Sequence, residues 1–340
     1  MTDPHVHFRD WNQSEKETVY HGMLTGALSG FDTFFDMPNT SPAVTTREAV
    51  LKRIELGASA EQKLEMQGHE VHYHLYCGLT PEKAQIAEMV KAYRDFFPRI
   101  CGLKMFASQS TGNMGITEEE AQAQVYRTLT DLGYTGVLAV HCEKESLFDS
   151  SASRHSDRRP SRSEAQSVRD QISFAQEAGF AGMLHIAHIS TKGALDEVRA
   201  ARERGIIKVT CGATPHHILL NRDAESEILK MNPPLRPEED RLAVWNGLFD
   251  GTIDWIESDH APHTLDDKKN GASGIPGFEG MLRAICALRA ALMPESRLTQ
   301  LLCTNALKAF GIGEKTAVVP EITSEMIASA RGAYPFSAWS

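Results

Sequence analysis

Residues 1–10, MTDPHVHFRD, alternate polar and apolar side chains in the manner of a short strand. Because successive side chains of a strand point to opposite faces, His5 and His7 point to the same side. Short apolar runs of this kind alternate with longer segments of helical spacing over most of the chain. The runs predict eight strands, at residues 5–8, 31–37, 71–77, 101–106, 136–142, 183–189, 206–211 and 253–258.

Segments with helical spacing lie between these strands. One of them follows Thr80 and has Pro81 at its first position, and another opens with Thr117 and Glu120, the spacing of a capping box. Alternation of strands and helices predicts a parallel sheet, and eight such units favour a closed (β/α)8 barrel over an open doubly wound sheet. The clearest helical segments are residues 15–28, 81–97, 117–132, 191–204 and 238–249.

The composition is that of an ordinary soluble globular protein, with 41% hydrophobic and 24% charged residues among 340. The formal net charge of -10 argues against nucleic acid or an anionic membrane as a partner, because neither attracts a net acidic surface. The six cysteines are scattered without a CxxC pair, which suits a reducing cytoplasm. No signal peptide is evident, and no run approaches the roughly 20 apolar residues that span a bilayer. We therefore expect a cytoplasmic protein.

Side chains that bind metals gather where the expected strands end. In a parallel barrel this edge carries the active site, so ligands from strands one, four, five, six and eight would converge there. Four histidines, a lysine and an aspartate provide enough nitrogen and oxygen ligands for two divalent metal ions. These residues are His5, His7, Lys104, His141, His188 and Asp259.

Lys104 lies inside the apolar stretch GLKMF, residues 102–106. A buried ammonium group is costly unless it is paired or loses its proton. One interpretation is a side chain that reaches solvent at the end of the strand. The other is a neutral amine that has taken up carbon dioxide, giving an anionic carbamate whose two oxygens can bridge two metal ions. The residues alone leave both interpretations open.

The sixth strand offers two histidines, of which one is expected to enter the site. His185 and His188 are an odd number of positions apart, so on a straight strand they face opposite ways. We predict His188 as the ligand because it is nearer the end of the strand. Asp259 can bind a metal ion and accept a proton from water, although a single aspartate at a strand end more often caps a helix. His216 and His217 follow strand seven and lie either behind the ligands, which is the preferred interpretation, or in a plain loop.

Several motifs of the chain resemble those of dihydroorotases, which are metal-dependent amidohydrolases. The matching motifs occur in the expected order, from residue 3 to about residue 310. They are DPHVHFRD (3–10), MPNT (37–40), GLK (102–104), HIAH (185–188), MNPPLR (231–236) and SDHAPH (258–263). The stretch YPF at 334–336 extends the resemblance into the C-terminal segment.

This resemblance implies an amidohydrolase-type (β/α)8 barrel that holds two zinc ions. A carboxylated Lys104 and a hydroxide would bridge the two ions. The implied ligands are His5, His7 and Asp259 for the more buried ion, and His141 and His188 for the other.

The implied reaction is the reversible hydrolysis of L-dihydroorotate to N-carbamoyl-L-aspartate, with ring closure as the direction of de novo pyrimidine biosynthesis. Asp259 would take the proton of the attacking hydroxide and pass it to the leaving amide nitrogen. Ser110 and Thr111, in a segment rich in Ser, Gly and Thr, are candidate lid residues. The residues implied to contact the substrate are Arg9, Asn39, Asn232 and His263.

Arg9 distinguishes a dihydroorotase from the nearest alternatives. Its guanidinium fork matches a carboxylate bidentately, and Arg9 shares the inward face of His7. A hydantoinase or an allantoinase would have nearly the same metal ligands, but a substrate without a ring carboxylate gives no reason for an arginine there. An inactive amidohydrolase-like structural partner would have gaps in the ligand set, and the sequence has none.

The pattern predicts one catalytic barrel at residues 1–312, followed by a C-terminal surface tail at 313–340. The polar stretches 150–162 and 266–277 are expected to be solvated loops. Since the first strand starts at residue 5, we expect no complete N-terminal β-domain of the kind that longer family members carry. We expect a homo-oligomer, most simply a dimer, that acts on a small molecule. Association with aspartate transcarbamoylase, whose product is the substrate of ring closure, stays open.

Overall fold

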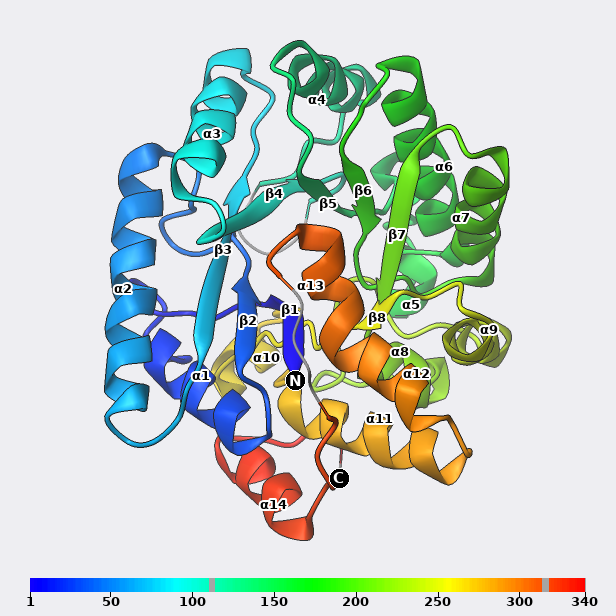
Figure 1. Ribbon diagram of the computed structural model, residues 1–340. Helices are drawn as coiled ribbons and strands as arrows, with labels where there is room; N and C mark the ends of the chain where they lie inside the picture. The colour runs from blue at the N-terminus through cyan, green and yellow to red at the C-terminus, as the bar shows by residue number, and fades with distance from the viewer. Residues whose placement is uncertain (110–113, 314–317, 340) are drawn as a thin grey trace.

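A computed structural model describes residues 1–109, 114–313 and 318–339 of the chain. In this part of the chain, eight strands pair in parallel and in chain order, and helices surround them (Figure 1). The strands are β1 Thr2–Val6, β2 Thr33–Asp36, β3 His72–Gly78, β4 Ile100–Phe106, β5 Val137–His141, β6 Met183–Ile186, β7 Lys208–Ala213 and β8 Trp255–Ile256.

The sheet closes into a barrel where β1 meets the segment that follows β8. Val6 pairs in parallel with His260, and the backbone N–H of His7 donates to the carbonyl oxygen of His260 at 2.7 Å. This contact completes the ring of pairings between consecutive strands. The predicted (β/α)8 barrel is therefore confirmed.

All eight expected strands are present, but β1, β2, β5, β6 and β8 end before their predicted last residues. β6 ends at Ile186 and β8 ends at Ile256, before the predicted ligands of these strands. His188 and Asp259 lie on the following loops and have positive φ angles, 40° and 48°. Residues other than glycine rarely adopt this left-handed conformation, which is incompatible with continued strand pairing.

Five helices lie where the sequence predicts them, and only their ends differ. The capping box expected at Thr117 and Glu120 is wrong, because α4 begins at Glu119 and has no side-chain cap at Glu118. The spacing of two residues therefore does not decide where a helix begins. The five helices are α1 Val19–Leu28, α3 Lys83–Phe96, α4 Glu119–Asp131, α7 Lys192–Arg204 and α9 Glu238–Asp250.

Two segments expected to be loops contain short helices. Residues 150–162 include α5 and the start of α6, and residues 266–277 include most of α10, which has a capping box between Thr264 and Asp267. Helices this short carry no clear apolar periodicity. None of the described helices has both the length and the apolar composition needed to cross a bilayer. The further helices are α2 Arg47–Glu65, α5 His155–Arg158, α6 Ser161–Glu177, α8 Pro215–Leu219, α10 Leu265–Lys269, α11 Phe278–Ala290, α12 Glu295–Thr299, α13 Asn305–Phe310 and α14 Ser324–Gly332.

An aromatic cluster fills the end of the barrel at which the strands begin. Helix α13 crosses this end (Figure 1) and contributes Phe310, which is buried. The centre of the Phe310 ring lies 4.9 Å from that of Phe35, 5.8 Å from that of Tyr76 and 5.9 Å from that of Trp255. Apolar side chains fill the interior of the barrel at this end. Within the barrel, polar side chains therefore gather at the opposite, carboxyl edge of the strands.

The C-terminal segment, expected as a surface tail, packs on the outer layer of the barrel. Met326 and Ile327 of α14 pack against the hydrophobic core, and α14 lies beside α1 and α11 (Figure 1). The buried hydroxyl of Tyr334 donates to Glu17 at 2.6 Å, across 317 positions of sequence. A contact between such distant positions leaves no local pattern in the sequence.

We predict that Phe310→Ala lowers the free energy of unfolding by about 3–5 kcal/mol, because it leaves a cavity where the ring packs. Phe249→Ala on α9 is the matched control, since its ring is 42% exposed; the expected change is about 1 kcal/mol or less. Urea unfolding followed by far-ultraviolet circular dichroism measures both variants. Equal destabilisation by the two substitutions would contradict the role of Phe310 in filling the end of the barrel at which the strands begin.

Candidate metal centre

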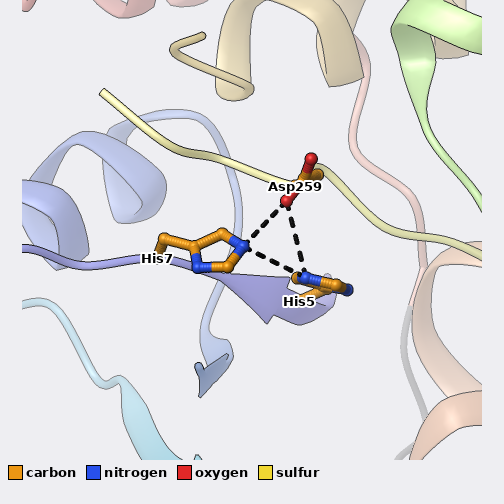
Figure 2. A group of neighbouring side chains, drawn as sticks. All are labelled: His5, His7 and Asp259. Carbon is orange, nitrogen blue, oxygen red and sulfur yellow. Dashed lines mark hydrogen bonds and ion pairs between the residues drawn. The ribbon is translucent and has the colours of Figure 1, made fainter. Parts of the chain in front are cut away.

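Three side chains with metal-binding atoms meet at the carboxyl edge of β1 and β8 (Figure 2). The Nε2 atom of His7 lies 2.9 Å from Oδ1 of Asp259 and 3.2 Å from Nε2 of His5. The Nε2 atom of His5 lies 3.5 Å from Oδ1 of Asp259. All three side chains are buried, and their ligand atoms lie within 4.8 Å of one another. Two imidazoles and a carboxylate are donors that zinc takes in proteins.

The closure of the barrel brings these side chains together. His5 lies on β1 and His7 follows two positions later, so both side chains face the barrel mouth. The backbone N–H of Ser258 donates to Oδ1 of Asp3 at 3.0 Å, which ties the residue before Asp259 to β1. His7 and Asp259 are 252 positions apart in sequence, and only the pairing of the first strand with the last makes them neighbours.

A second pair of histidines lies beside this cluster. The Nδ1 atom of His141, at the end of β5, is 3.1 Å from Nε2 of His188, on the loop after β6. The rings of His188 and His5 are 5.2 Å apart, centre to centre. His185 instead lies 3.2 Å from Glu257. The two predicted ligand groups are therefore adjacent, and His188 rather than His185 joins them.

Lys104 lies on β4 with its amine buried, and among the described residues Nζ has no hydrogen-bond partner. Burial lowers the pKa of this amine to about 8, although Glu257 and Asp259 favour its charged form. The neutral amine is the form that adds carbon dioxide. Lys268 differs from Lys104 in its hydrogen bonding, because its buried amine donates to three backbone carbonyl groups.

Burial keeps His5 and His188 neutral. It lowers the pKa of His5 to about 4, and together with neighbouring His141 it holds the pKa of His188 well below its ordinary value. Burial alone would raise the pKa of Asp259, but the hydrogen bond from His7 and nearby imidazoles lower it overall. At neutral pH His5 and His188 are therefore neutral imidazoles and Asp259 is a carboxylate, which are the forms that bind metal ions.

Two buried glutamates contact the ligands and were not given a role from the sequence. Oε2 of Glu143 lies 3.0 Å from Nε2 of His141. Glu257 accepts a hydrogen bond from the backbone N–H of His188 and lies 3.5 Å from Nδ1 of His5. Each glutamate stands two positions from a predicted ligand, so the alternation of the strand was a signal that could have found it.

Arg9 is buried beside the cluster. Its Nε donates to the carbonyl oxygen of Pro262 at 3.1 Å, and its NH2 group lies 3.2 Å from Nε2 of His263. Within the described ranges, Arg9 forms no ion pair with a carboxylate. Burial lowers the pKa of the guanidinium, against the pull of more distant acids such as Glu17. A buried cation in this state favours an anionic ligand.

Asn39 and Asn232, both predicted to contact substrate, line one cavity together with Arg9 and the histidines and aspartate of the two groups. Oδ1 of Asn39 lies 2.6 Å from Nδ1 of His7. The segment that carries Asn232 is fixed by His217, whose Nε2 lies 3.2 Å from the carbonyl oxygen of the next residue, Pro233. His217 therefore lies behind the site, as expected from its position after β7.

The lid predicted at Ser110 and Thr111 lies outside the described residues. The chain leading into this stretch is held by Gln109, whose backbone N–H donates to Glu145 at 2.9 Å. Beyond it, Gly115 pairs with Phe106 at the end of β4. The assignment of the two lid residues stays a prediction.

Comparison with known sequences gives relatives that share one name, dihydroorotase. No protein-family model matches the chain. The dihydroorotase of Methanosarcina mazei is 33% identical over 335 residues, which cover 91% of this chain and 69% of that protein. The dihydroorotase of Lactobacillus gasseri is 33% identical over 343 residues, which cover 94% of this chain and 75% of that protein.

Solved structures share the fold. An L-hydantoinase (dihydropyrimidinase) from Arthrobacter aurescens superposes with a TM-score of 0.79 at 23% identity and covers 92% of this chain and 70% of its own. A dihydroorotase from Campylobacter jejuni superposes with a TM-score of 0.70 at 19% identity and covers 92% of this chain and 84% of its own. At these identities the likeness establishes the common barrel and nothing finer.

Barrel, cluster and relatives agree on the class of protein, which is a cyclic amide hydrolase of the amidohydrolase type. The sequence relatives identify the family within this class, because the matched relatives are dihydroorotases and the matches run over most of both chains. The chain belongs to the dihydroorotase family.

We predict that Glu143→Gln weakens zinc binding by roughly 10- to 100-fold, because the amide no longer supplies the charge that orients the ring of His141. Competition with a chelator, followed by metal analysis, measures the affinity. Glu279→Gln is the matched control, since this glutamate of α11 instead pairs with Arg283 and Arg331. Equal zinc affinity in wild type and Glu143→Gln would show that Glu143 does not support the ligand.

Proposed function

We propose that the chain is a dihydroorotase, which hydrolyses L-dihydroorotate reversibly to N-carbamoyl-L-aspartate and closes the ring in de novo pyrimidine biosynthesis. The observation that carries this proposal is the buried guanidinium of Arg9, which lines the same cavity as the metal-ligand cluster without an ion pair among the described residues. A carboxylate on the substrate ring would supply the missing counter-charge.

The donor set fits two zinc ions. Burial keeps His5 and His188 neutral, and neutral imidazole is a common zinc ligand. The buried amine of Lys104, which has no hydrogen-bond partner in the described part of the chain, suits conversion to a carbamate that would help to hold the ions. The remaining ligands would be His5, His7 and Asp259 for one ion, and His141 and His188 for the other.

The ions, when bound, would polarise the ring carbonyl and lower the pKa of water toward neutrality. Asp259 would move the proton, and its lowered pKa means that it starts as a carboxylate. One of its oxygens accepts a proton as the water oxygen bonds to the carbonyl carbon. Asp259 then donates this proton to the ring nitrogen as the carbon–nitrogen bond breaks. Ring closure reverses these steps and releases water.

Arg9 and its neighbours would orient the substrate. The guanidinium of Arg9 can donate two parallel hydrogen bonds to a carboxylate. Burial and the charge of Arg9 lower the pKa of His263 to about 3, so His263 stays neutral beside the guanidinium and adds no competing charge. Asn39 and Asn232 offer amide donors and acceptors to the remaining ring atoms.

A hydantoinase activity is the second candidate, because an L-hydantoinase shares the fold with a TM-score of 0.79. The uncharged hydantoin ring would leave Arg9 without a counter-charge, which disfavours this candidate. A purely structural role is also disfavoured, since every predicted metal ligand lies at the cluster or beside it in the described part of the chain.

The catalytic unit would comprise residues 1–312, with the segment that follows packed on its outside. The resemblance to dihydroorotases further suggests a cytoplasmic homodimer. Association with aspartate transcarbamoylase remains a prediction from the chemistry of the two reactions.

We predict that the zinc-loaded protein turns over L-dihydroorotate in preference to hydantoin and allantoin. Arg9→Ala should lower kcat/KM for L-dihydroorotate by about 100-fold, or ~3 kcal/mol, with zinc content retained. Arg204→Ala, at an exposed position in the last turn of α7, is the control and should behave as wild type. Preferential turnover of an uncharged ring, or full activity of Arg9→Ala, would refute the substrate assignment.

A further inference from the structure

The turn that presents Arg9 has an unusual backbone. Asp10 and Trp11 follow directly and both have positive φ angles, 77° and 51°. Residues other than glycine rarely adopt this conformation, and it persists only where surrounding contacts hold it. Strand pairing does not extend to this point, because β1 ends at Val6. The turn is held by backbone bonds, such as that from the N–H of Asp10 to the carbonyl oxygen of Glu17 at 2.8 Å, and by side chains that bind the backbone just before it.

Arg53, on α2, binds the backbone of this turn. Its side chain is fully buried, and its NH1 and NH2 groups donate to the carbonyl oxygens of Arg9 at 2.7 Å and Phe8 at 2.5 Å. Its guanidinium carbon also lies 5.1 Å from the centre of the Trp11 ring. One side chain thus contacts the residue before Arg9, Arg9 itself and the strained turn after it.

Asp36 and Tyr73 fix the guanidinium of Arg53. Oδ2 of Asp36 accepts from Nε of Arg53 at 2.9 Å, from NH2 at 2.7 Å and from the hydroxyl of Tyr73 at 2.7 Å. Oδ1 of Asp36 accepts from the backbone N–H of Phe8 at 2.9 Å. All these groups are buried, so water does not compete for the bonds. The network joins α2, β2 and β3 to the backbone that carries Arg9.

We infer that Arg53 is a positioning residue, which sets the recognition of the substrate carboxylate by holding the backbone of Arg9. This inference rests on the proposed function, in which Arg9 binds that carboxylate. Neither Arg53 nor Asp36 lines the cavity, so the effect passes through Arg9. A carboxylate far from the reacting bond is bound alike in the ground state and the transition state, and loss of such binding raises KM while kcat is kept.

Arg53→Lys tests the inference. The ammonium keeps a positive charge beside Asp36 but is a single point donor, which cannot serve two carbonyls and a carboxylate as the guanidinium fork does. We expect KM for L-dihydroorotate to rise roughly ten-fold, with kcat within about two-fold of wild type and zinc content unchanged. Arg297→Lys is the matched control and should keep the wild-type KM, since Arg297 donates to two backbone carbonyls elsewhere, those of Leu248 and Ile253.

A double-mutant cycle with Arg9→Ala separates positioning from a general structural effect. If Arg53 acts through Arg9, Arg53→Lys raises KM in the wild-type background and leaves it unchanged in the Arg9→Ala background. An equal rise in both backgrounds, or no rise in the wild-type background, overturns the inference while the proposed function stands. If Arg9→Ala itself keeps wild-type kinetics, the proposed function fails and the inference fails with it.

Tyr73→Phe provides a second variant for the case in which Arg53→Lys does not fold. It removes one hydrogen bond to Asp36 and leaves Arg53 in place. We expect KM to rise about two- to five-fold with kcat unchanged. The loss of the hydrogen bond from Tyr73 loosens Asp36, and only part of that loss reaches Arg9 through Arg53. An unfolded Arg53→Lys together with an unchanged KM in Tyr73→Phe would assign Arg53 to folding alone and overturn the inference.

Discussion

The hydrogen bond from the backbone N–H of His7 to the carbonyl oxygen of His260 joins the first strand to the last, and the candidate centre depends on this closure. It brings Asp259 to the two histidines of β1, although the residues come from opposite ends of the chain. The opposite end of the barrel is filled by Phe310 and the aromatic rings around it. Ligands from several strands therefore converge at one edge, as in other barrels of this type.

Two buried basic side chains at this edge have no carboxylate partner among the described residues. The amine of Lys104 is buried without a hydrogen bond, and Arg9 is buried without an ion pair within the described residues. Unpaired groups of this kind lower the stability of a fold, and they are characteristic of functional sites, where a ligand completes them. By contrast, the buried carboxylate of Asp36 is paired with the guanidinium of Arg53. The unpaired Lys104 and Arg9 therefore indicate where anions and metal ions are expected to bind.

The sequence predicts the barrel and the principal ligand candidates because both follow from local patterns. Apolar runs place the strands, and alternation along a strand puts His5 and His7 on one face. The odd spacing of His185 and His188 separates them, and the structure places His188 beside His141 and His185 beside Glu257. Two-residue motifs are less reliable, as the absent capping box at Thr117 illustrates.

Long-range contacts explain what the sequence could not predict. Arg53 lies 44 positions from Arg9, on a helix whose apolar pattern is weak, and nothing local links the two. Tyr334 and Glu17 meet across 317 positions, so the packing of the C-terminal segment was missed. Glu143 and Glu257 each stand two positions from a predicted ligand, but their role became evident only once their contacts with the ligand histidines were known.

The most direct test of this account is diffraction from crystals grown with zinc and bicarbonate, recorded at the zinc absorption edge. The account predicts two anomalous peaks, one within about 2.0–2.2 Å of ligand atoms of His5, His7 and Asp259, and one at the same distance from His141 and His188. It also predicts extra density on the amine of Lys104 between the peaks. A single peak beside an unmodified Lys104 would contradict the two-metal centre on which the proposed function rests.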